Sequence, residues 1–159
     1  MPAATRTDPR RRARETALQV LYECELAGEP LDEVLASWRH ERPYRLNDAL
    51  EAVWPALDDE VWAMAEGLAQ GTARRLAEID PLIVAQAEHW RLERMPVVDR
   101  LILRLAVFEF LASPDTPRAV VINEAVELAR TFSTEAAVKF VNGVLDGIGR
   151  TLSAAPGTR

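Results

Sequence analysis

The chain has 159 residues and a mass of 17.7 kDa, a length that suits one domain burying roughly 70% of its unfolded surface. Its 48% hydrophobic and 28% charged residues indicate a globular protein, and its single cysteine excludes an internal disulfide framework. Arg104 and Glu109 interrupt the longest apolar stretch and the arginine-rich start lacks the apolar segment of a secretory signal, so we expect a cytoplasmic protein without a membrane span.

The N-terminal segment differs in charge from the rest of the chain. Residues 1–14 hold five arginines against Asp8, a net of +4, whereas the remainder holds 14 basic and 24 acidic side chains, a net of −10. This asymmetry suggests an arm that meets an anion such as nucleic acid. A solvated, frayed tail is the alternative interpretation. We expect residues 1–8 to form a flexible arm.

The first predicted helix begins at Asp8-Pro9, a capping aspartate followed by proline, and ends at Gly28. Pro30 begins a second helix, and a less certain piece follows over residues 46–54. One face of the first helix is apolar at three- and four-residue spacing and carries Ala13, Ala17, Val20, Leu21 and Cys24.

Two more helices are predicted in the middle of the chain. The acidic residues Asp58–Glu60 complement the positive end of a helix that runs to Ile79. Asp80-Pro81 repeats the capping signal and starts a short helix ending near Trp90. The pair Gly67-x-x-x-Gly71 permits a close helix crossing.

The second half of the chain predicts three long helices. Pro96 opens the helix 97–112, which is apolar almost all round and therefore central. Thr116-Pro117 starts the next helix, and Ser133 is expected to cap the last one. Each of the last two helices carries apolar residues at helical spacing.

No stretch alternates with period two, and no hairpin turn separates two such stretches. The sequence therefore predicts an all-α fold of about seven helices. We expect one helical domain over residues 9–150 and a disordered tail over residues 151–159.

Residues for catalysis or metal binding are lacking. His40 and His89 are far apart and have no neighbouring ligands at metal-binding spacing. Cys24 lies on the apolar face of the first helix, which favours a packed thiol over a nucleophile. Phosphate-binding glycine motifs and a nucleophile elbow are absent from the sequence. We expect no enzyme activity, no cofactor and no metal.

Two positions carry an aromatic ring beside a cation outside the predicted core. On the first helix, Arg11, Glu15 and Tyr22 project within about 40° of each other, opposite the apolar face. On the last helix, Phe140 flanks the core next to Lys139, the only lysine. Ring and cation suit a nucleobase and its phosphate. Packing of Tyr22 on a neighbouring helix, and of Phe140 over the edge of the core, are the alternatives.

Long combined motifs occur in four stretches: Arg10–Glu15 with Gln19 and Leu21-Tyr22; Asp99-Arg100 with Leu103–Ala106 and Glu109; Val121–Ala129; and Lys139–Asp146. Together they resemble the NusB family of bacterial transcription antitermination factors, over roughly residues 10–27 and 61–148. Gly67 and Trp90 also fall where family members often carry them.

The resemblance implies two packed helical bundles without catalytic activity. It implies binding of the single-stranded boxA element of nascent ribosomal RNA transcripts. It also implies a heterodimer with NusE, a small-subunit ribosomal protein, inside an antitermination complex on RNA polymerase. By position, Asp99 would face NusE. The RNA surface would comprise Arg10, Arg11, Arg12, Arg14, Tyr22, Lys139 and Phe140.

The sequence departs from the family pattern at several positions. Ser133 replaces a common glycine, and Val138 replaces a frequent polar residue, which would reduce RNA contacts. The segment 28–60 is longer than in many members, and the sequence does not determine how it packs. The choice between a monomer and a homodimer is open as well.

Two other functions are alternatives. NusB-like accessory domains precede some ribosomal RNA cytosine methyltransferases, but these 159 residues contain neither a cofactor-binding α/β domain nor a catalytic cysteine. A helical scaffold whose basic segment docks an acidic protein is the other alternative.

Overall fold

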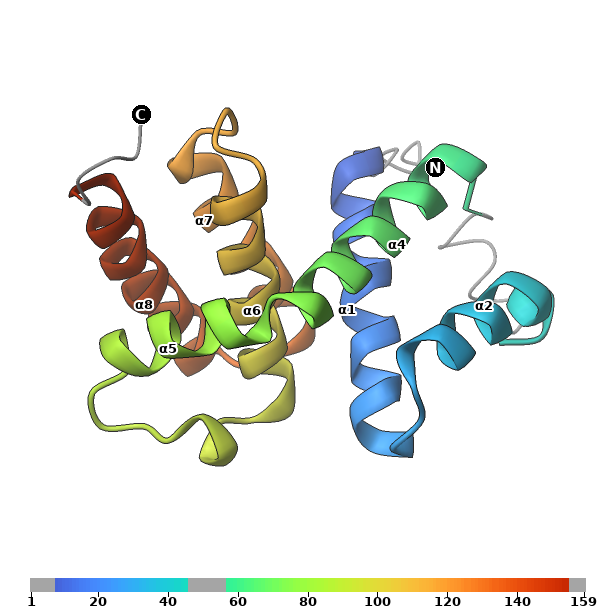
Figure 1. The fold of residues 1–159 in the computed structure, drawn as a ribbon, viewed down its shortest axis with the longest axis horizontal. Coiled ribbons are helices and arrows are strands. Elements are labelled where there is room, and N and C mark those ends of the chain that lie inside the picture. The colour runs from blue at the N-terminus through green and yellow to red at the C-terminus, as the bar shows by residue number, and fades with distance from the viewer. Residues whose placement is uncertain (1–7, 46–56, 155–159) are drawn as a thin grey trace, which may run out of the picture. The chain divides into compact units, whose positions relative to one another are not determined.

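The computed structural model describes residues 8–45 and 57–154, with the side chains of residues 40–45 excepted. These residues form helices and connections without a strand, so the prediction of an all-α fold is confirmed. The described helices, labelled as in Figure 1, are α1 (Pro9–Ala27), α2 (Leu31–Arg45), α4 (Asp59–Arg74), α5 (Leu76–Gln86), the 3₁₀ turn η1 (Leu92–Arg94), α6 (Val97–Ala112), α7 (Arg118–Phe132) and α8 (Glu135–Ala154).

The chain divides into two compact units, Met1–Ala69 and Gln70–Arg159. The division falls within α4, and each unit is described separately. The predicted piece over residues 46–54 lies outside the described residues, as do most of the N-terminal arm and residues 155–159. In the part of the chain that is described, no helix combines the length and hydropathy needed to cross a membrane.

Helix α1 has the ends that its sequence predicts. The carboxylate of Asp8 accepts a 2.9 Å hydrogen bond from the backbone N–H of Arg10, and Pro9 occupies the first turn, where it is tolerated. Gly28 adopts a left-handed φ of 67°, and its N–H donates to the carbonyl of Cys24. This conformation is common at helix C-termini and favours glycine.

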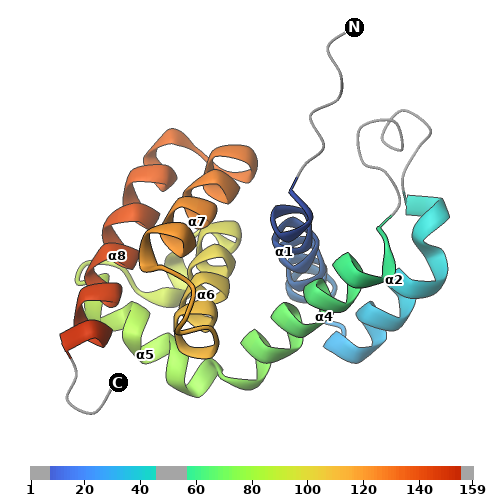
Figure 2. The same cartoon turned by 90° about the horizontal axis from the view of Figure 1, so that it is seen from above.

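The first unit packs α1 against α2, which lie side by side in both views (Figure 2). The rings of Trp38 and Trp62 stack with centroids 6.5 Å apart and 13° between their planes. Nε1 of Trp38 donates a 2.7 Å hydrogen bond to Glu23, and Arg39 forms an ion pair with Glu66. These contacts show how Trp38 packs, which the sequence did not determine for the segment 28–60.

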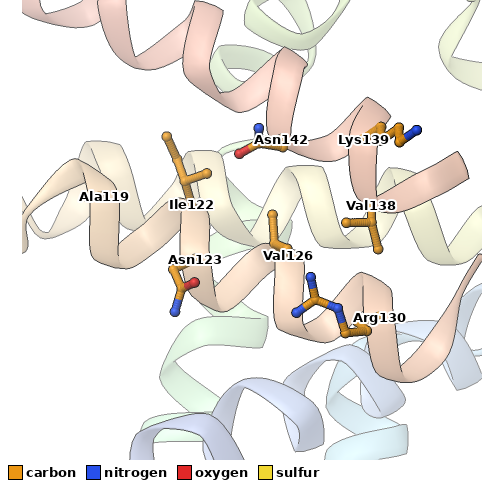
Figure 3. A pocket seen from close by; sticks show the side chains of 8 residues that line it. All are labelled: Ala119, Ile122, Asn123, Val126, Arg130, Val138, Lys139 and Asn142. Atoms are coloured by element: carbon orange, nitrogen blue, oxygen red, sulfur yellow. The ribbon is translucent and has the colours of Figure 1, made fainter. Parts of the chain in front are cut away.

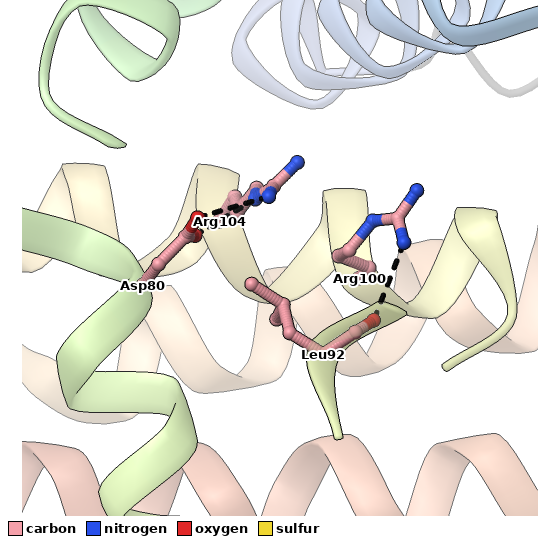
Figure 4. Close-up of polar contacts among 4 residues, drawn as sticks. All are labelled: Asp80, Leu92, Arg100 and Arg104. Carbon is pink, nitrogen blue, oxygen red and sulfur yellow. Dashed lines mark hydrogen bonds and ion pairs between the residues drawn. The ribbon is translucent and has the colours of Figure 1, made fainter. Parts of the chain in front are cut away.

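The boundary between α4 and α5 differs from the prediction. The chain leaves helical geometry at Arg75, with φ −111° and ψ 19°, and not at Asp80-Pro81, which lies within α5. Asp80 does not cap a helix because its carboxylate binds Arg104 of α6 (Figure 4). Helix α5 also ends at Gln86, earlier than expected, and a turn follows before Trp90.

The second unit is built around α6, which begins and ends where the sequence predicts. It contacts α5, α7 and α8, and α7 also packs along α8. Gly71 allows a close approach, because a Cβ there would collide with the ring of Phe108 on α6. The fully buried side chains of this unit include Ile79, Ile83, Ile102, Leu103, Val107, Val121, Val141, Leu145 and Ile148.

Two polar contacts hold α5 and η1 on α6 (Figure 4). Arg104 binds both carboxylate oxygens of Asp80, with distances of 2.9 Å from Nε and 3.0 Å from Nη2. Nη1 of Arg100 donates a 3.2 Å hydrogen bond to the carbonyl of Leu92. The connection between α5 and α6 is therefore anchored on both sides of residues 87–91.

The ends of α8 correct two predictions. Ser133 does not cap the helix; instead Oγ1 of Thr134 accepts a 3.1 Å hydrogen bond from the backbone N–H of Ala137. The helix also continues through residues 151–154, which we expected to be disordered. Arg118 and the hydroxyl of Ser153 are 3.3 Å apart in hydrogen-bond geometry, and Gln86 donates to Thr151, so the last turn is held by α7 and α5.

Candidate nucleic-acid interface

The arginines of α1 lie in its first two turns and differ in exposure. Arg10 is exposed, whereas Arg11 and Arg12 are half-buried. Arg14 is only 9% exposed, so the unbound chain does not present it on the surface, and its part in RNA binding stays a prediction. Four and seven residues later on the same face are the buried side chains of Leu18 and Leu21, so this face is turned inward.

The electrostatics of this segment are unusual for a helix N-terminus. No acidic residue lies in the first turn of α1, and the arginines add to the positive end of the helix dipole. Burial lowers the pKa of the Arg12 guanidinium, and Glu15 opposes that shift. Arginine nevertheless stays charged at neutral pH. The first two turns of α1 thus hold four arginines, cations of the kind that bind phosphate, beside the capping carboxylate of Asp8.

Tyr22 lies on the outside of α1, with 38% of its surface exposed. The helical wheel placed it there, three turns from Arg11 along the same face. The ring of Tyr22, on the first unit, is therefore accessible to a binding partner. Its part in binding stays a prediction.

On the second unit, α8 presents a lysine and an aromatic ring in adjacent positions. Lys139 is exposed, and no described residue forms an ion pair with it. Phe140 is half-buried, and its ring meets that of Trp90 edge-on, with centroids 6.1 Å apart and planes at 61°. Trp90 is itself 53% exposed. The sequence did not single out Trp90 as a binding residue, because its predicted position at a helix end gave no sign of exposure.

A groove of about 520 Å³ runs between α7 and α8 beside Lys139 (Figure 3). Its aliphatic floor includes Ile122, Val126 and Val138, so the valine that replaces a polar residue adds apolar surface here. The polar groups come from Lys139, Arg130, Asn123 and Asn142, of which Arg130 also pairs with Glu127. The groove offers amide donors and acceptors next to two cations.

Asp99 does not lie on the surface. It is 5% exposed in the first turn of α6, and its Oδ1 accepts a 2.6 Å hydrogen bond from the hydroxyl of Ser133. A contact between Asp99 and NusE is not supported by this buried position. Its carboxylate instead joins α6 to the α7–α8 connection.

The remaining chemically reactive residues have ordinary settings. Burial raises the pKa of the Cys24 thiol, and the neighbouring Glu23 raises it further, so the thiolate is disfavoured. His89 is exposed, and the side chain of His40 lies outside the described part. Among the described residues, no three His, Cys, Asp or Glu side chains are grouped so that they could hold a metal ion.

These features define an all-helical protein that exposes cations and aromatic rings, the two ingredients of single-stranded RNA recognition. The sequence model of the NusB family matches residues 11–150, and the chain belongs to that family.

The relatives agree with this assignment. The chain is 43% identical over 149 residues to the transcription antitermination protein NusB of Koribacter versatilis, covering 94% of each chain. It is similar to the structure of NusB from T. maritima, with 35% identity, a TM-score of 0.73 and coverage of 90% of this chain and 92% of that one. It is also similar to a chain in the crystal structure of antitermination factors NusB and NusE in complex with dsRNA, with 29% identity, a TM-score of 0.72 and coverage of 90% and 97%.

Proposed function

We propose that this protein is a non-catalytic RNA-binding adaptor of transcription antitermination. It binds the boxA element of nascent ribosomal RNA transcripts as a single strand, together with NusE, and contributes to the antitermination complex on RNA polymerase. Binding to a nascent transcript places this activity in the bacterial cytoplasm. The similarity to NusB relatives, one of them in a complex with NusE and RNA, supports the proposal.

The observation that carries the proposal is that Lys139 lies next to the half-buried ring of Phe140, which contacts the exposed Trp90. Lys139 has no ion-pair partner in the described chain, so its charge is available to a phosphate. An aromatic ring with an open face can stack a base, and each such stack contributes about 1–3 kcal/mol. Cation and ring together match a nucleotide.

The first turns of α1 supply a second set of contacts. The carboxylate of Asp8 caps this helix, and four arginines follow in its first two turns. Phosphates that bind these arginines displace counterions, which favours association at low salt. The acidic remainder of the chain repels RNA and confines it to the cationic positions.

The chemistry of the site favours unpaired RNA. Rings stack on bases only when those bases are splayed out of a helix, whereas double-stranded RNA is contacted through its backbone and shape. We therefore propose single-stranded boxA as the ligand, although the related complex contains double-stranded RNA.

Fluorescence anisotropy with labelled RNA tests this function. The full chain, with and without NusE, is titrated into single-stranded boxA, a scrambled sequence of equal length and a boxA duplex. We expect preference for single-stranded boxA and tighter binding with NusE, since linked binding sites strengthen each other. Equal affinity for boxA and scrambled RNA, with weak salt dependence, would support a protein-binding scaffold instead.

Variants localise the binding. Tyr22→Ala and Phe140→Ala are each expected to weaken boxA binding about 5- to 100-fold while the domain stays folded. Val84→Ala is the control, because Val84 is an exposed apolar residue on α5 to which the proposal gives no RNA contact. Unchanged affinity of both aromatic variants would refute stacking by these rings.

A further inference from the structure

Trp90 is an exposed aromatic residue held on a fixed segment. Burial of an aromatic side chain removes about 150–250 Å² of surface from water, so a tryptophan left 53% exposed forfeits much of that stabilisation. The backbone N–H of Trp90 donates to the carbonyl of Ala87 at 2.9 Å, which closes the turn before it. The Arg100 hydrogen bond to Leu92 anchors the chain after it (Figure 4). The exposed ring is thus positioned from both sides.

The geometry of the Trp90–Phe140 pair limits how bases can stack on it. With 61° between the ring planes, one flat base cannot lie parallel to both rings. Two bases stacked on this pair must therefore use different rings, and the rings are close enough for neighbouring nucleotides, since the centroids are 6.1 Å apart. Lys139, next to Phe140 in the chain, supplies the cation for the phosphate between or beside them.

Gly143 leaves room for such a ligand on α8. It follows Lys139 by four residues and Phe140 by three, so the three positions share a face of the helix. Gly143 is exposed, and a Cβ there would meet no atom within 4 Å. Glycine within a helix costs about 1 kcal/mol relative to alanine, and the chain's own packing does not require it here.

We propose that Trp90 is a second base-stacking residue of the RNA surface. Trp90 and Phe140 bind two successive unpaired bases of one strand, and Gly143 keeps the helix surface beside them low enough for the strand to approach. The inference rests on the proposed RNA-binding function and adds a residue that the sequence reasoning did not assign. The alternative is that Trp90 only covers Phe140 and contributes to folding.

Anisotropy titrations of the full chain with single-stranded boxA separate these roles. Trp90→Ala is expected to weaken binding about 5- to 100-fold, whereas Trp90→Phe, which keeps a ring, stays within about threefold. Gly143→Gln is expected to weaken binding at least about fivefold while the thermal midpoint stays equal or rises, because glutamine is the better helix former. Val84→Ala again serves as the control.

Abasic substitutions in the RNA give a readout that folding does not affect. In the wild type, two adjacent abasic positions should each weaken binding; in Trp90→Ala, one of them should lose its effect. Wild-type affinity in Trp90→Ala beside weakened Phe140→Ala would overturn the inference and leave the proposed function standing. Unchanged binding by Gly143→Gln, or an abasic pattern identical in both proteins, would also overturn it. Failure of the wild type to prefer boxA would overturn the proposed function and the inference together.

Discussion

The hydroxyl of Ser133 donates a 2.6 Å hydrogen bond to the carboxylate of Asp99 and joins the residue that ends α7 to the first turn of α6. Asp99 is 5% exposed, so its carboxylate depends on protein donors in place of water. Its negative charge also faces the positive end of α6, where it is favourable. Both residues therefore act in the architecture of the second unit.

Ser133→Ala removes this donor from a buried carboxylate. We expect the free energy of unfolding to fall by about 1–3 kcal/mol, the usual cost of a buried charged group that loses a hydrogen bond. Urea denaturation followed by circular dichroism measures the change. Ser113→Ala, at an exposed site after α6, should cost less than about 0.5 kcal/mol. Equal stability of the two variants would contradict this role for Ser133.

The Asp80–Arg104 pair gives a second stability prediction (Figure 4). Its side chains are 26% and 13% exposed, so water screens the pair only in part. Asp80→Asn keeps the shape and removes the charge, and we expect a loss of about 1–3 kcal/mol in the free energy of unfolding. Asp115→Asn, in the exposed α6–α7 connection, is the matched control. A result for Asp80→Asn within about 0.5 kcal/mol of the wild type would show that this pair does not hold α5 on α6.

The salt dependence of RNA affinity tests the role of Lys139. Each phosphate neutralised on a single strand contributes about −0.7 to the slope of log K against log salt. With Arg10, Arg11 and Lys139 as the accessible cations, and Arg12 as a fourth, we expect a slope between about −2 and −3.

Lys139→Gln should make this slope shallower by about 0.7. Arg150→Gln serves as the control on the same helix, because Arg150 is engaged by Asp146 at 2.7 Å. Identical slopes for Lys139→Gln and the wild type would remove Lys139 from the phosphate contacts.

The thiol of Cys24 should react slowly in the folded chain. Burial and Glu23 raise its pKa, so less thiolate is present at a given pH than in an unfolded chain, and the rise in rate with pH should come later. Alkylation between pH 7 and 9, measured by mass spectrometry with and without urea, tests this. A folded chain that reacts as fast as the unfolded one would contradict it.

The helix boundaries set by proline were predictable from sequence. Pro9, Pro96 and Pro117 each stand at the beginning of a helix, because proline fixes φ and lacks an N–H that the first turn does not need. The helix start predicted at Asp80-Pro81 was wrong, because Asp80 binds Arg104, a residue 24 positions away in the sequence. The residues around Asp80 in the sequence do not indicate such a distant partner.

For the candidate site, the sequence predicted which face of a helix a residue occupies better than how deeply that residue is buried. A helical wheel placed Tyr22 outside the core correctly, but it gave no width for the buried face of α1. That face is wide enough to include Arg14 and Thr16. The width depends on how many elements pack around a helix. The exposure of Trp90 and the burial of Asp99 likewise follow from tertiary contacts that periodicity does not contain.

Photo-crosslinking of boxA RNA to the full chain, with the attached peptides identified by mass spectrometry, tests the location of the RNA surface most directly. The account predicts crosslinks at Tyr22 on α1 and at Phe140 and Trp90 on the second unit, all competed by unlabelled boxA. Competed crosslinks that fall only elsewhere, for example along α4 or α5, would contradict it.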